Sequence, residues 1–579
     1  MRRTIAVLAA LGLMLVAAAP QALAAEGPKK NDKDTKVQLL AFNDFHGNLE
    51  PPAGSSGRIA VSSSATVDAG GVEYLATHIK QLREQNSNTI TVGAGDLIGA
   101  SPLTSALFHD EPTIEAMNLL GLQVSGVGNH EFDAGVNELL RMQNGGCHPA
   151  DGCQDGTPFA GSLFQYLAAN VFYAGTSQTI LPPYEIEKVD NAKIAFIGLT
   201  LEGTPLIVTP TGVAGLDFRP EVQTVNALVK KLREDQGVRA FVVLIHQGGQ
   251  QNAPFANGFM DVNRCDNFSG DIKPIVDGLD PQVDLVISAH THQPYICNFG
   301  GRYVTSASSF GRLVTDIDLT IDHQTKDVKD VTARNVIVTR DVKDRDQTAL
   351  IAKYNAIAGP IKARIVGSIA ADITRTTSFA QETALGDVIA DAQLASTAPS
   401  DFGGAVVAFM NPGGIRADLV CIAIPVAFPC NVTYDQMFTV QPFSNVMTVK
   451  TMTGQQIYDL LAQQFNNPSA GALRVLQVSN GFTYSYSFTG ADPSATPPVA
   501  GAGTITPGSV KIGGVVVDPL ASYRVAMNNF LASGGDGFSV FNQGTDQLGG
   551  EIDIDAFVAY FEKNSPVAPG PRDRITRLP

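Results

Sequence analysis

The chain has 579 residues, a formal net charge of −16 at pH 7, and 44% hydrophobic residues. This length exceeds what one hydrophobic core usually serves, so we expect two domains. Nucleic acid polymers are bound through clustered lysine and arginine, so the acidic balance argues against DNA or RNA as the ligand. A small anionic ligand stays compatible with it, because metal ions or a few placed arginines can reverse the field locally.

The N-terminal segment has the three parts of a secretory signal peptide. Two arginines precede a long apolar run, and the small-residue site Ala-Leu-Ala follows at 22–24. A membrane anchor would need about 20 apolar residues and a charged stop, whereas Pro20 and Gln21 interrupt the run here. We therefore predict a signal peptide at 1–24, a mature protein that is secreted to the periplasm or the extracellular space, and no stable membrane anchor.

Six cysteines are expected to form disulfides in such an oxidising compartment. Six cysteines permit fifteen pairings, so the spacing alone leaves the connectivity open. None has the C-x-x-C spacing of a zinc or redox site, which favours a structural role. Close in sequence are Cys147 and Cys153, Cys265 and Cys297, and Cys421 and Cys430.

Between residues 37 and about 320 one pattern recurs: a short apolar run, then an abrupt turn rich in Asp, Asn, His and Gly. Continuous β-branched runs of this length are typical of strands buried on both faces, in a sheet covered by helices. A helix-like stretch at 70–85 lies between two of them. We predict a layered α/β domain with strands at 37–42, 89–95, 124–128, 193–199, 240–245 and 283–288.

Past residue 320 the apolar runs become sparse and charge becomes dense, which indicates a domain boundary that ends in a solvated helix. Further on, 382–394 has the pattern of an amphipathic helix and 405–410 that of a strand. Thr453 and Gln456 form a capping box that opens another helix. The predicted division is a first domain at 36–340, a linker helix at 341–366 and a second α/β domain at 367–579.

Five of the nine histidines lie in the turns that follow apolar runs. Because open α/β sheets collect ligands at the carboxyl ends of their strands, turns that are distant in sequence can converge there. A single histidine of this kind is more often an ordinary side chain than a ligand, but five in such turns favour a common site. They are His46, His130, His246, His290 and His292, and Asn129 beside His130 adds an amide oxygen.

The spacing of these residues suits a metal cluster. Asp44 and His46, like His290 and His292, stand two residues apart, which in extended backbone points both side chains to the same side. Asp96 ends a glycine-rich run, where a carboxylate can bridge two ions. Mixed carboxylate, amide and imidazole ligation favours Mn, Zn, Co or Fe ions over calcium or a thiolate zinc site.

The ordered set D-x-H, GD, GNHEFD, H and H-x-H resembles the calcineurin-like metallophosphoesterase superfamily, although Ala289 replaces the usual glycine before the last motif. The resemblance implies two divalent ions that hold a bridging hydroxide for in-line attack on phosphorus. His130 and Asp133 match the catalytic pair, in which the carboxylate orients an imidazole that stabilises the transition state; a structural contact is the alternative. The implied ligands are Asp44, His46, Asp96 and His292 for one ion, and Asp96, Asn129, His246 and His290 for the other.

Three motifs in the second half, NPGGIR at 411–416, VQPFSNV at 440–446 and NNFLASGGDGF at 528–538, resemble the C-terminal domain of periplasmic and ecto-5′-nucleotidases. The similarity covers nearly the whole mature chain and implies a hydrolase that releases phosphate from nucleotides. Phe443 and Phe530 would sandwich the base, although most phenylalanines are core residues.

The same resemblance assigns the polar contacts of the substrate. Arg375 and Arg416 would hold its phosphate or ribose side. Asp536 would accept from ribose hydroxyls, and Asn445 and Gly471 would contact the base. In members of this family the two domains close on each other by rotation about the linker, and we expect the same here.

Phe379 stands where the periplasmic enzymes have a second arginine. This departure leaves the substrate open among a nucleoside monophosphate, a UDP-sugar, a dinucleotide and a cyclic nucleotide. Two alternatives remain: an exported hydrolase of non-nucleotide phosphate or thiosulfate esters, for which the two phenylalanines would have nothing to stack on, and a non-catalytic surface protein, which would not need every metal position filled.

Overall fold

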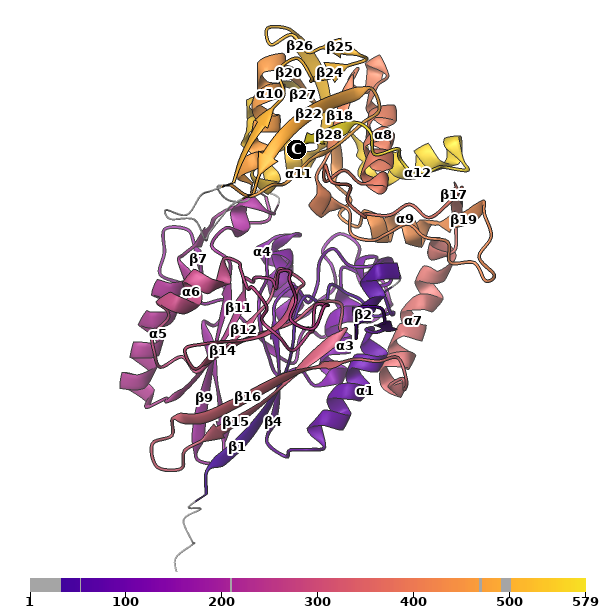
Figure 1. The fold of residues 1–579 in the computed structure, drawn as a ribbon. Coiled ribbons are helices and arrows are strands. Elements are labelled where there is room, and N and C mark those ends of the chain that lie inside the picture. The colour runs from indigo at the N-terminus through magenta and orange to yellow at the C-terminus, as the bar shows by residue number, and fades with distance from the viewer. Residues whose placement is uncertain (1–32, 53, 209–210, 468–470, 491–500) are drawn as a thin grey trace, which may run out of the picture.

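The computed structural model describes residues 33–52, 54–208, 211–467, 471–490 and 501–579, so the predicted signal peptide at 1–24 lies outside the described residues. The chain forms two α/β domains, with the N-terminal domain below and the C-terminal domain above in Figure 1. This confirms the predicted fold class. None of the helices in the described ranges combines the length and hydropathy needed to span a bilayer.

Two six-stranded sheets face each other in the N-terminal domain, and buried valine, leucine and isoleucine side chains fill the space between them. The first sheet has the order β16 (Val328–Ile337), β15 (Leu313–Ile321), β1 (Thr35–Phe42), β4 (Thr89–Ala94), β5 (Val124–Gly126) and β6 (Gln165–Leu167). The second has the order β13 (Pro294–Phe299), β14 (Arg302–Ala307), β12 (Leu285–Ser288), β11 (Ala240–His246), β9 (Ala192–Thr200) and β8 (Tyr184–Val189).

The six predicted apolar runs coincide with β1, β4, β5, β9, β11 and β12. They are apolar throughout because one face meets the other sheet while the outer face meets helices. Strand β1 runs parallel to β4, β4 to β5, and β11 to both β9 and β12, so their carboxyl ends lie at one edge of the domain. The covering helices are α1 (Val72–Arg83), α3 (Glu111–Leu120) and α7 (Arg345–Lys362) on one side, and α5 (Glu221–Gln236) and α6 (Ile272–Gly278) on the other.

Helix α7 is less solvated than its charged sequence indicated. Leu350, Ile351, Tyr354 and Ala358 are buried in the core of the N-terminal domain. Arg345, Asp346 and Lys353 are exposed, so an apolar stripe lies among charged positions. Lys362 is largely buried, where it bonds Glu50 and Thr104. Strand β17 (Ile365–Ile369) follows and begins the C-terminal domain.

The C-terminal domain is built on a five-stranded sheet in the order β21 (Gln477–Val478), β18 (Val407–Met410), β26 (Ser522–Asn528), β20 (Val446–Thr453) and β27 (Thr545–Ile552). The predicted capping box is confirmed, because Thr453 and Gln456 exchange hydrogen bonds between side chain and backbone at the start of α10 (Gly454–Gln463). Helix α8 (Ala384–Thr397) is buried on most sides, so the expected amphipathic pattern was only partly right. It packs against β18 and α12 (Asp553–Asn564).

Smaller elements complete the two domains. In the N-terminal domain these are α2 (Leu103–Ala106), α4 (Val136–Asn144), β2 (Arg58–Ala60), β3 (Thr66–Asp68), β7 (Val171–Tyr173) and β10 (Leu216–Phe218). In the C-terminal domain they are β19 (Cys430–Thr433), α9 (Tyr434–Val440), β22 (Phe482–Thr489), β23 (Ala502–Ile505), β24 (Lys511–Ile512), β25 (Val515–Val516), α11 (Asn529–Ala532) and β28 (Ile575–Leu578).

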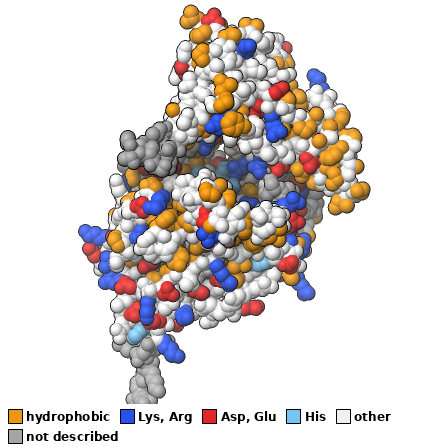
Figure 2. Space-filling view, viewed as in Figure 1, with side chains coloured by type: hydrophobic (Ala, Val, Ile, Leu, Met, Phe, Trp, Pro, Cys, Tyr) orange, Lys and Arg blue, Asp and Glu red, His pale blue; other side chains and the backbone are white. Residues whose placement is uncertain are grey.

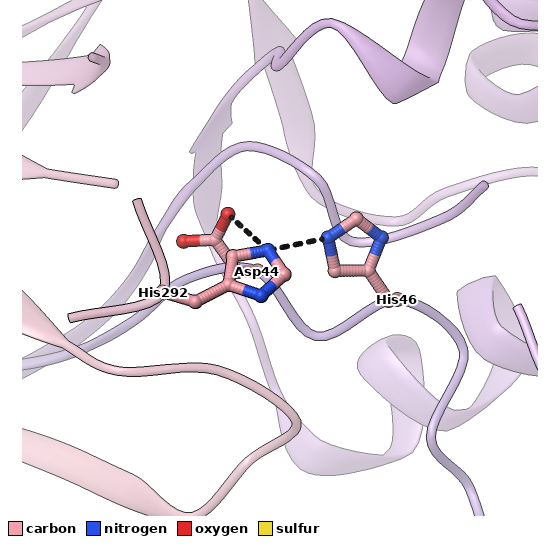
Figure 3. Close-up of side chains that lie close together, drawn as sticks. All are labelled: Asp44, His46 and His292. Atoms are coloured by element: carbon pink, nitrogen blue, oxygen red, sulfur yellow. Dashed lines mark hydrogen bonds and ion pairs between the residues drawn. The ribbon is translucent and has the colours of Figure 1, made fainter. Parts of the chain in front are cut away.

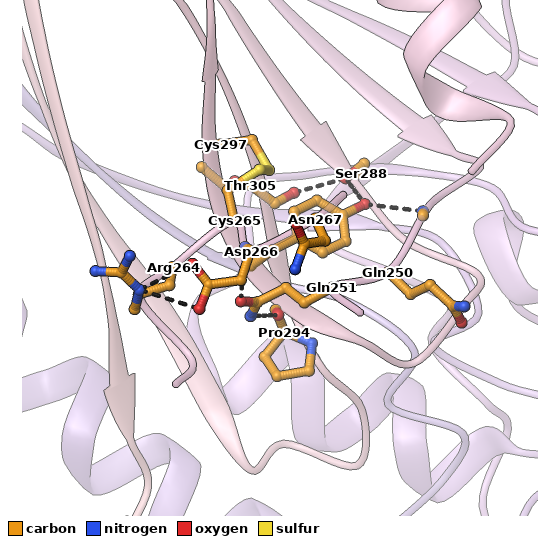
Figure 4. The surroundings of a disulfide bond; sticks show 12 residues. Gln250, Gln251, Arg264, Cys265, Asp266, Asn267, Ser288, Pro294, Cys297 and Thr305 are labelled. Carbon is orange, nitrogen blue, oxygen red and sulfur yellow. Dashed lines mark hydrogen bonds and ion pairs between the residues drawn. A yellow bond between two sulfur atoms is a disulfide. The ribbon is translucent and has the colours of Figure 1, made fainter. Parts of the chain in front are cut away.

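All six cysteines form disulfides between sequence neighbours, which confirms the structural role predicted for them. Figure 4 shows the bond from Cys265 to Cys297, which ties a loop to β13. Gln251 reinforces the attachment, since its side chain accepts from the amide of Asp266 at 3.2 Å and donates to the carbonyl of Pro294 at 2.9 Å. The other bonds are Cys147 to Cys153 and Cys421 to Cys430.

Candidate metal centre and substrate cavity

The predicted metal ligands converge where the carboxyl ends of the parallel strands meet. Both sheets contribute, because the ends of β1, β4 and β5 face those of β11 and β12 across the core. Asp44 and His46 follow β1, Asp96 follows β4, Asn129 follows β5, His246 ends β11, and His290 and His292 follow β12.

The backbone at these turns differs from the extended form that the sequence analysis assumed. Asp44 and His46 have φ of 49° and 48°, and His290 and His292 have φ of 73° and 56°, so both pairs lie in the left-handed region. Asp96 joins them at 50°. Such conformations cost about 1–3 kcal/mol each and persist only where the surroundings hold them. The expected geometry of the two pairs was therefore wrong, although the side chains still meet.

Hydrogen bonds between two neighbouring turns hold this strained backbone. The amide of Asp44 donates to the carbonyl of Gly95 at 3.1 Å, and the amide of His46 donates to that of Asp96 at 3.0 Å. Glu131 adds a second clamp, because its buried carboxylate accepts from the amides of Asp96 at 2.9 Å and Leu97 at 2.8 Å. The turn after β4 is thus fixed from both sides, and Asp96 with it.

The side chains form two groups that share Asp96. In the first, His292 Nε2 lies 3.4 Å from Asp44 Oδ1 and 3.1 Å from His46 Nε2 (Figure 3). In the second, Asp96 Oδ2 lies 3.0 Å from His246 Nε2, with His290 close to both. The same Asp96 oxygen lies 3.5 Å from His46 Nε2. One carboxylate oxygen therefore stands between the two groups.

The hydrogen bonds of two imidazoles show why this cluster needs positive charge. His46 Nδ1 lies 2.8 Å from the carbonyl of Gly99, and His246 Nδ1 lies 2.9 Å from that of Ala94. A carbonyl only accepts, so both Nδ1 atoms carry a proton, and both Nε2 atoms face Asp96. Burial opposes a second proton on His246, but the carboxylates of Asp96 and Asp44 outweigh it and raise the pKa of His246 to about 9. Positive charge is therefore favoured between Asp96 and the two rings, and a divalent ion could supply it in place of the proton on His246 Nε2.

Other groups in the cluster agree with this reading. Asn129 Oδ1 is buried and has no hydrogen-bond partner among the described residues. Burial raises the pKa of Asp44 to about 7, with the neighbouring Asp96 adding to the effect. Burial lowers the pKa of His290 to about 3, helped by the charge on His246. A set of buried acceptors that repel one another fits divalent cations.

His130 and Asp133 form the expected pair beside this centre. His130 Nδ1 lies 2.7 Å from Asp133 Oδ2, which leaves Nε2 for another partner. Burial opposes protonation of the ring, but the carboxylates of Asp133 and Asp96 outweigh it and raise the pKa of His130. The ring also lies 5.7 Å from that of Phe443, with 21° between their planes, so it stands where the two domains meet.

A cavity of about 270 Å³ extends from this centre between the domains, in the hollow that Figure 2 shows between the two halves of the molecule. Its wall combines residues of the metal centre with half-buried phenylalanines of the C-terminal domain. The N-terminal domain contributes Asn129, His130, Asp133, Ile207, Val208 and His290. The C-terminal domain contributes Asn411, Gly413, Gly414, Arg416, Phe443, Asn445, Arg474, Asn528, Phe530 and Asp536.

Asp536 is held in this wall by two residues that the sequence analysis missed. Its Oδ2 accepts from Asn411 Nδ2 at 2.9 Å, and its Oδ1 accepts from Arg474 Nη1 at 2.7 Å. Asn411 opens the NPGGIR motif and could have been selected on that ground. No motif contains Arg474, which reaches the cavity only through the folding of the domain. Asn445, for which a contact with the base was predicted, lines the cavity and donates to Asp553 at 3.2 Å.

Arg375 lies in a neighbouring cavity of about 240 Å³, on the His292 side of the centre. Its Nη2 donates to Ser56 Oγ at 3.2 Å across the domain boundary. Arg416 lines both cavities, and Arg312 of the N-terminal domain joins it here. Arg312 is anchored by Ser308 and Ser309 and was also missed by the sequence analysis. Three guanidinium groups thus converge beside the metal centre.

Comparison with known proteins decides the family. Residues 37–294 match the calcineurin-like phosphoesterase family, and residues 361–543 match the 5′-nucleotidase C-terminal domain. A cell wall protein of Listeria monocytogenes is 30% identical over 91% of this chain and 67% of its own length. The chain belongs to the 5′-nucleotidase family. Both predicted resemblances are confirmed, and the protein is a phosphoric ester hydrolase of a family that uses divalent metal ions.

Two further comparisons agree with this assignment. The endonuclease YhcR of Bacillus subtilis is 30% identical over 93% of this chain, which spans 41% of that protein's length. The 5′-nucleotidase precursor of Thermus thermophilus superimposes with a TM-score of 0.73 at 22% identity, covering 94% of this chain and 99% of that one. The second comparison confirms the two-domain fold of the family.

Two positions taken from the 5′-nucleotidase resemblance lie elsewhere. Phe379 is 67% exposed and packs under Arg577, whose Cζ lies 4.7 Å from the ring centre, so it lines neither cavity. Gly471 also lines neither cavity; its amide donates to Asn466, and a Cβ added to it would lie 2.4 Å from the amide nitrogen of Gly501. The structure thus gives Gly471 a close backbone approach, and its contact with the base stays a prediction.

Proposed function

We propose that this family member is an exported hydrolase that releases phosphate from nucleotides with two divalent ions. One observation carries the proposal: a single cavity is lined both by the candidate metal centre, through Asn129 and His290, and by Phe443 and Phe530. A nucleotide has the two matching parts, a phosphate for the metal side and a flat base for the aromatic side.

The metal ions would be held as the two groups of side chains indicate. Divalent ions at this position would supply a nucleophile at neutral pH and offset the charge of the phosphoryl oxygens. The mixed donor set suits Mn, Zn, Co or Fe ions. One ion would take Asp44, His46, Asp96 and His292, and the other Asp96, Asn129, His246 and His290.

His130 would donate a hydrogen bond to the phosphate. Asp133 fixes its Nδ1, so Nε2 can donate to a phosphoryl oxygen or to the leaving oxygen. The raised pKa of His130 favours the protonated form that this donation needs. Arg416 stands on the same side. Among the described residues its side chain makes one hydrogen bond, from Nη1 to the Gly413 carbonyl at 3.4 Å, so its other donors can bind phosphate.

Base and ribose would be recognised by the C-terminal domain. Phe443 and Phe530 would stack on the base, with Asn445 at its edge. Asp536 keeps acceptor capacity after its bonds to Asn411 and Arg474, because each carboxylate oxygen has two lone pairs, and it would accept from ribose hydroxyls. The arginines Arg312, Arg375 and Arg416 would hold phosphate oxygens without a contribution from position 379.

Export is part of the same proposal. It rests on the signal-peptide pattern at 1–24, on the disulfides, and on the similarity to a cell wall protein. We also keep the domain division at 36–340, 341–366 and 367–579, and a small nucleotide in place of a nucleic acid polymer as the substrate.

The test is phosphate release from AMP, UDP-glucose, ATP and 2′,3′-cyclic AMP by the purified chain. We expect turnover of at least one nucleotide, loss of turnover with a chelator, and recovery on addition of Mn²⁺. Single-stranded RNA and DNA are expected to be poor substrates because of the net charge of −16. Hydrolysis of thiosulfate or sugar-phosphate esters with none of these nucleotides would favour the alternative hydrolase.

A further inference from the structure

A second cluster of ligand-type side chains lies away from the residues that line the two cavities. His109 stands in the turn between α2 and α3, and His148 and Asp151 stand in the loop that the Cys147–Cys153 disulfide closes. One ligand atom from each of the three side chains lies within 4.8 Å of the other two.

The two imidazoles are stacked face to face. Their ring centres lie 3.6 Å apart with 13° between the planes. Two protonated rings would repel each other strongly at this distance, so the stack favours neutral imidazoles, the form that binds metal. Burial, with the adjacent His109, lowers the pKa of His148, which agrees with this reading.

Both rings direct a nitrogen toward one carboxylate oxygen. His109 Nε2 lies 2.7 Å and His148 Nδ1 3.5 Å from Asp151 Oδ2. The amide of Asp151 donates to His148 Nδ1 at 3.3 Å, so that nitrogen is unprotonated, and a bound ion would replace this long hydrogen bond at its one lone pair. An ion with bonds of about 2.0–2.1 Å in tetrahedral geometry keeps its ligand atoms about 3.3 Å apart. Small side-chain movements would therefore complete the coordination.

We propose that His109, His148 and Asp151 form a separate metal site that binds a borderline divalent ion such as Zn²⁺. Two imidazoles and one carboxylate are a donor set that such ions prefer, and a fourth position would be left to water. The three side chains are 29%, 20% and 51% exposed, so an ion can enter from solvent. The bound ion joins the disulfide loop to the turn before α3 and thereby stabilises that corner of the N-terminal domain.

The test is the zinc content of the full chain after equilibration with low micromolar Zn²⁺ and removal of free metal, measured by mass spectrometry. His148→Gln and Asp151→Asn are each expected to bind one ion fewer per chain than the wild type. Neither residue lines a cavity described above, so phosphate release should stay within about twofold of the wild type. Zinc should also raise the Tm of the wild type more than that of either variant.

His78→Gln is the matched control, because His78 lies on α1 outside the cluster and bonds the carbonyl of Tyr74. It should bind as many ions as the wild type. Asp151→Asn changes an exposed side chain and keeps the test valid if His148→Gln misfolds. Equal zinc content in the wild type and Asp151→Asn would overturn the proposal, whatever the result of the nucleotide assays.

Discussion

The two domains contribute to the cavity in different ways. The metal side is made mostly of buried side chains, and hydrogen bonds from neighbouring turns hold the strained backbone at Asp44, His46 and Asp96. The aromatic side is made of half-buried side chains, Phe443 on the loop between α9 and β20 and Phe530 on the short helix α11. Metal chemistry depends on ligand distances and so needs rigidly held side chains. Stacking on a flat base tolerates side chains that are held less tightly.

Asp96→Asn removes the charge that both ligand groups share. We expect kcat to fall by about 10³-fold or more, at the upper end of what one electrostatic group contributes. The loss should be equal for AMP and p-nitrophenyl phosphate, because the base plays no part in it. Phosphate release and bound metal are the measurements, and a variant with a tenth of wild-type activity would contradict the shared-ligand assignment.

His130→Ala separates catalysis from metal binding. A positioned acid or base contributes about 10²–10⁴-fold, so we expect kcat to fall by about 10²-fold. Metal content should stay at the wild-type value, since His130 bonds Asp133 and is assigned no ion. Asp133→Asn should lower kcat by about tenfold, because Asp133 orients the His130 ring and does not itself contact the phosphate. Loss of a bound ion in His130→Ala would show that His130 is a metal ligand and would contradict its assignment as a hydrogen-bond donor.

Phe443→Ala and Phe530→Ala test the aromatic side. Stacking contributes about 1–3 kcal/mol per base, so each change should raise KM for AMP by about tenfold. KM for p-nitrophenyl phosphate should stay constant within twofold. Phe428→Ala is the matched control, because Phe428 is an exposed ring of the same domain that lines neither cavity. Equal losses on both substrates would remove the base sandwich from the proposal.

Gly471→Ala gives the smallest effect and decides between two roles for this residue. Its φ of 76° and the nearby Gly501 backbone make an added Cβ unfavourable, so we expect the free energy of unfolding to fall by about 1–2 kcal/mol. KM for AMP should not change. Gly508→Ala, at φ 70° but in open space, isolates the backbone strain. A higher KM at unchanged stability would restore the base contact expected from the sequence.

The sequence predicted the strands and the ligand positions for one physical reason. Strands such as β4 and β11 are buried on both faces and so are apolar throughout, and the polar residues that end them stand out. The left-handed backbone at Asp44 and His46 could not be predicted, because residues other than glycine rarely adopt it, and the enrichment of Asp and His in this region does not single out particular positions.

The cavity residues that could not be predicted from the sequence come from parts of the chain that meet only after folding. Arg474 acquires its role from Asp536, and Arg375 lies beside Ser56 of the other domain. Arg312 enters the second cavity from a turn that carries no motif. Such residues are ordinary charged side chains until the partner across the cavity is known.

The central claim is that one cavity joins the metal centre to the base-binding wall. The most direct test is a crystal structure of the full chain with Mn²⁺ and a non-hydrolysable phosphonate analogue of AMP. We predict the adenine between Phe443 and Phe530 and the phosphonate beside Asp96 and Asn129, with two ions bound. A base outside this cavity, or a phosphonate held away from Asp96, would contradict the claim.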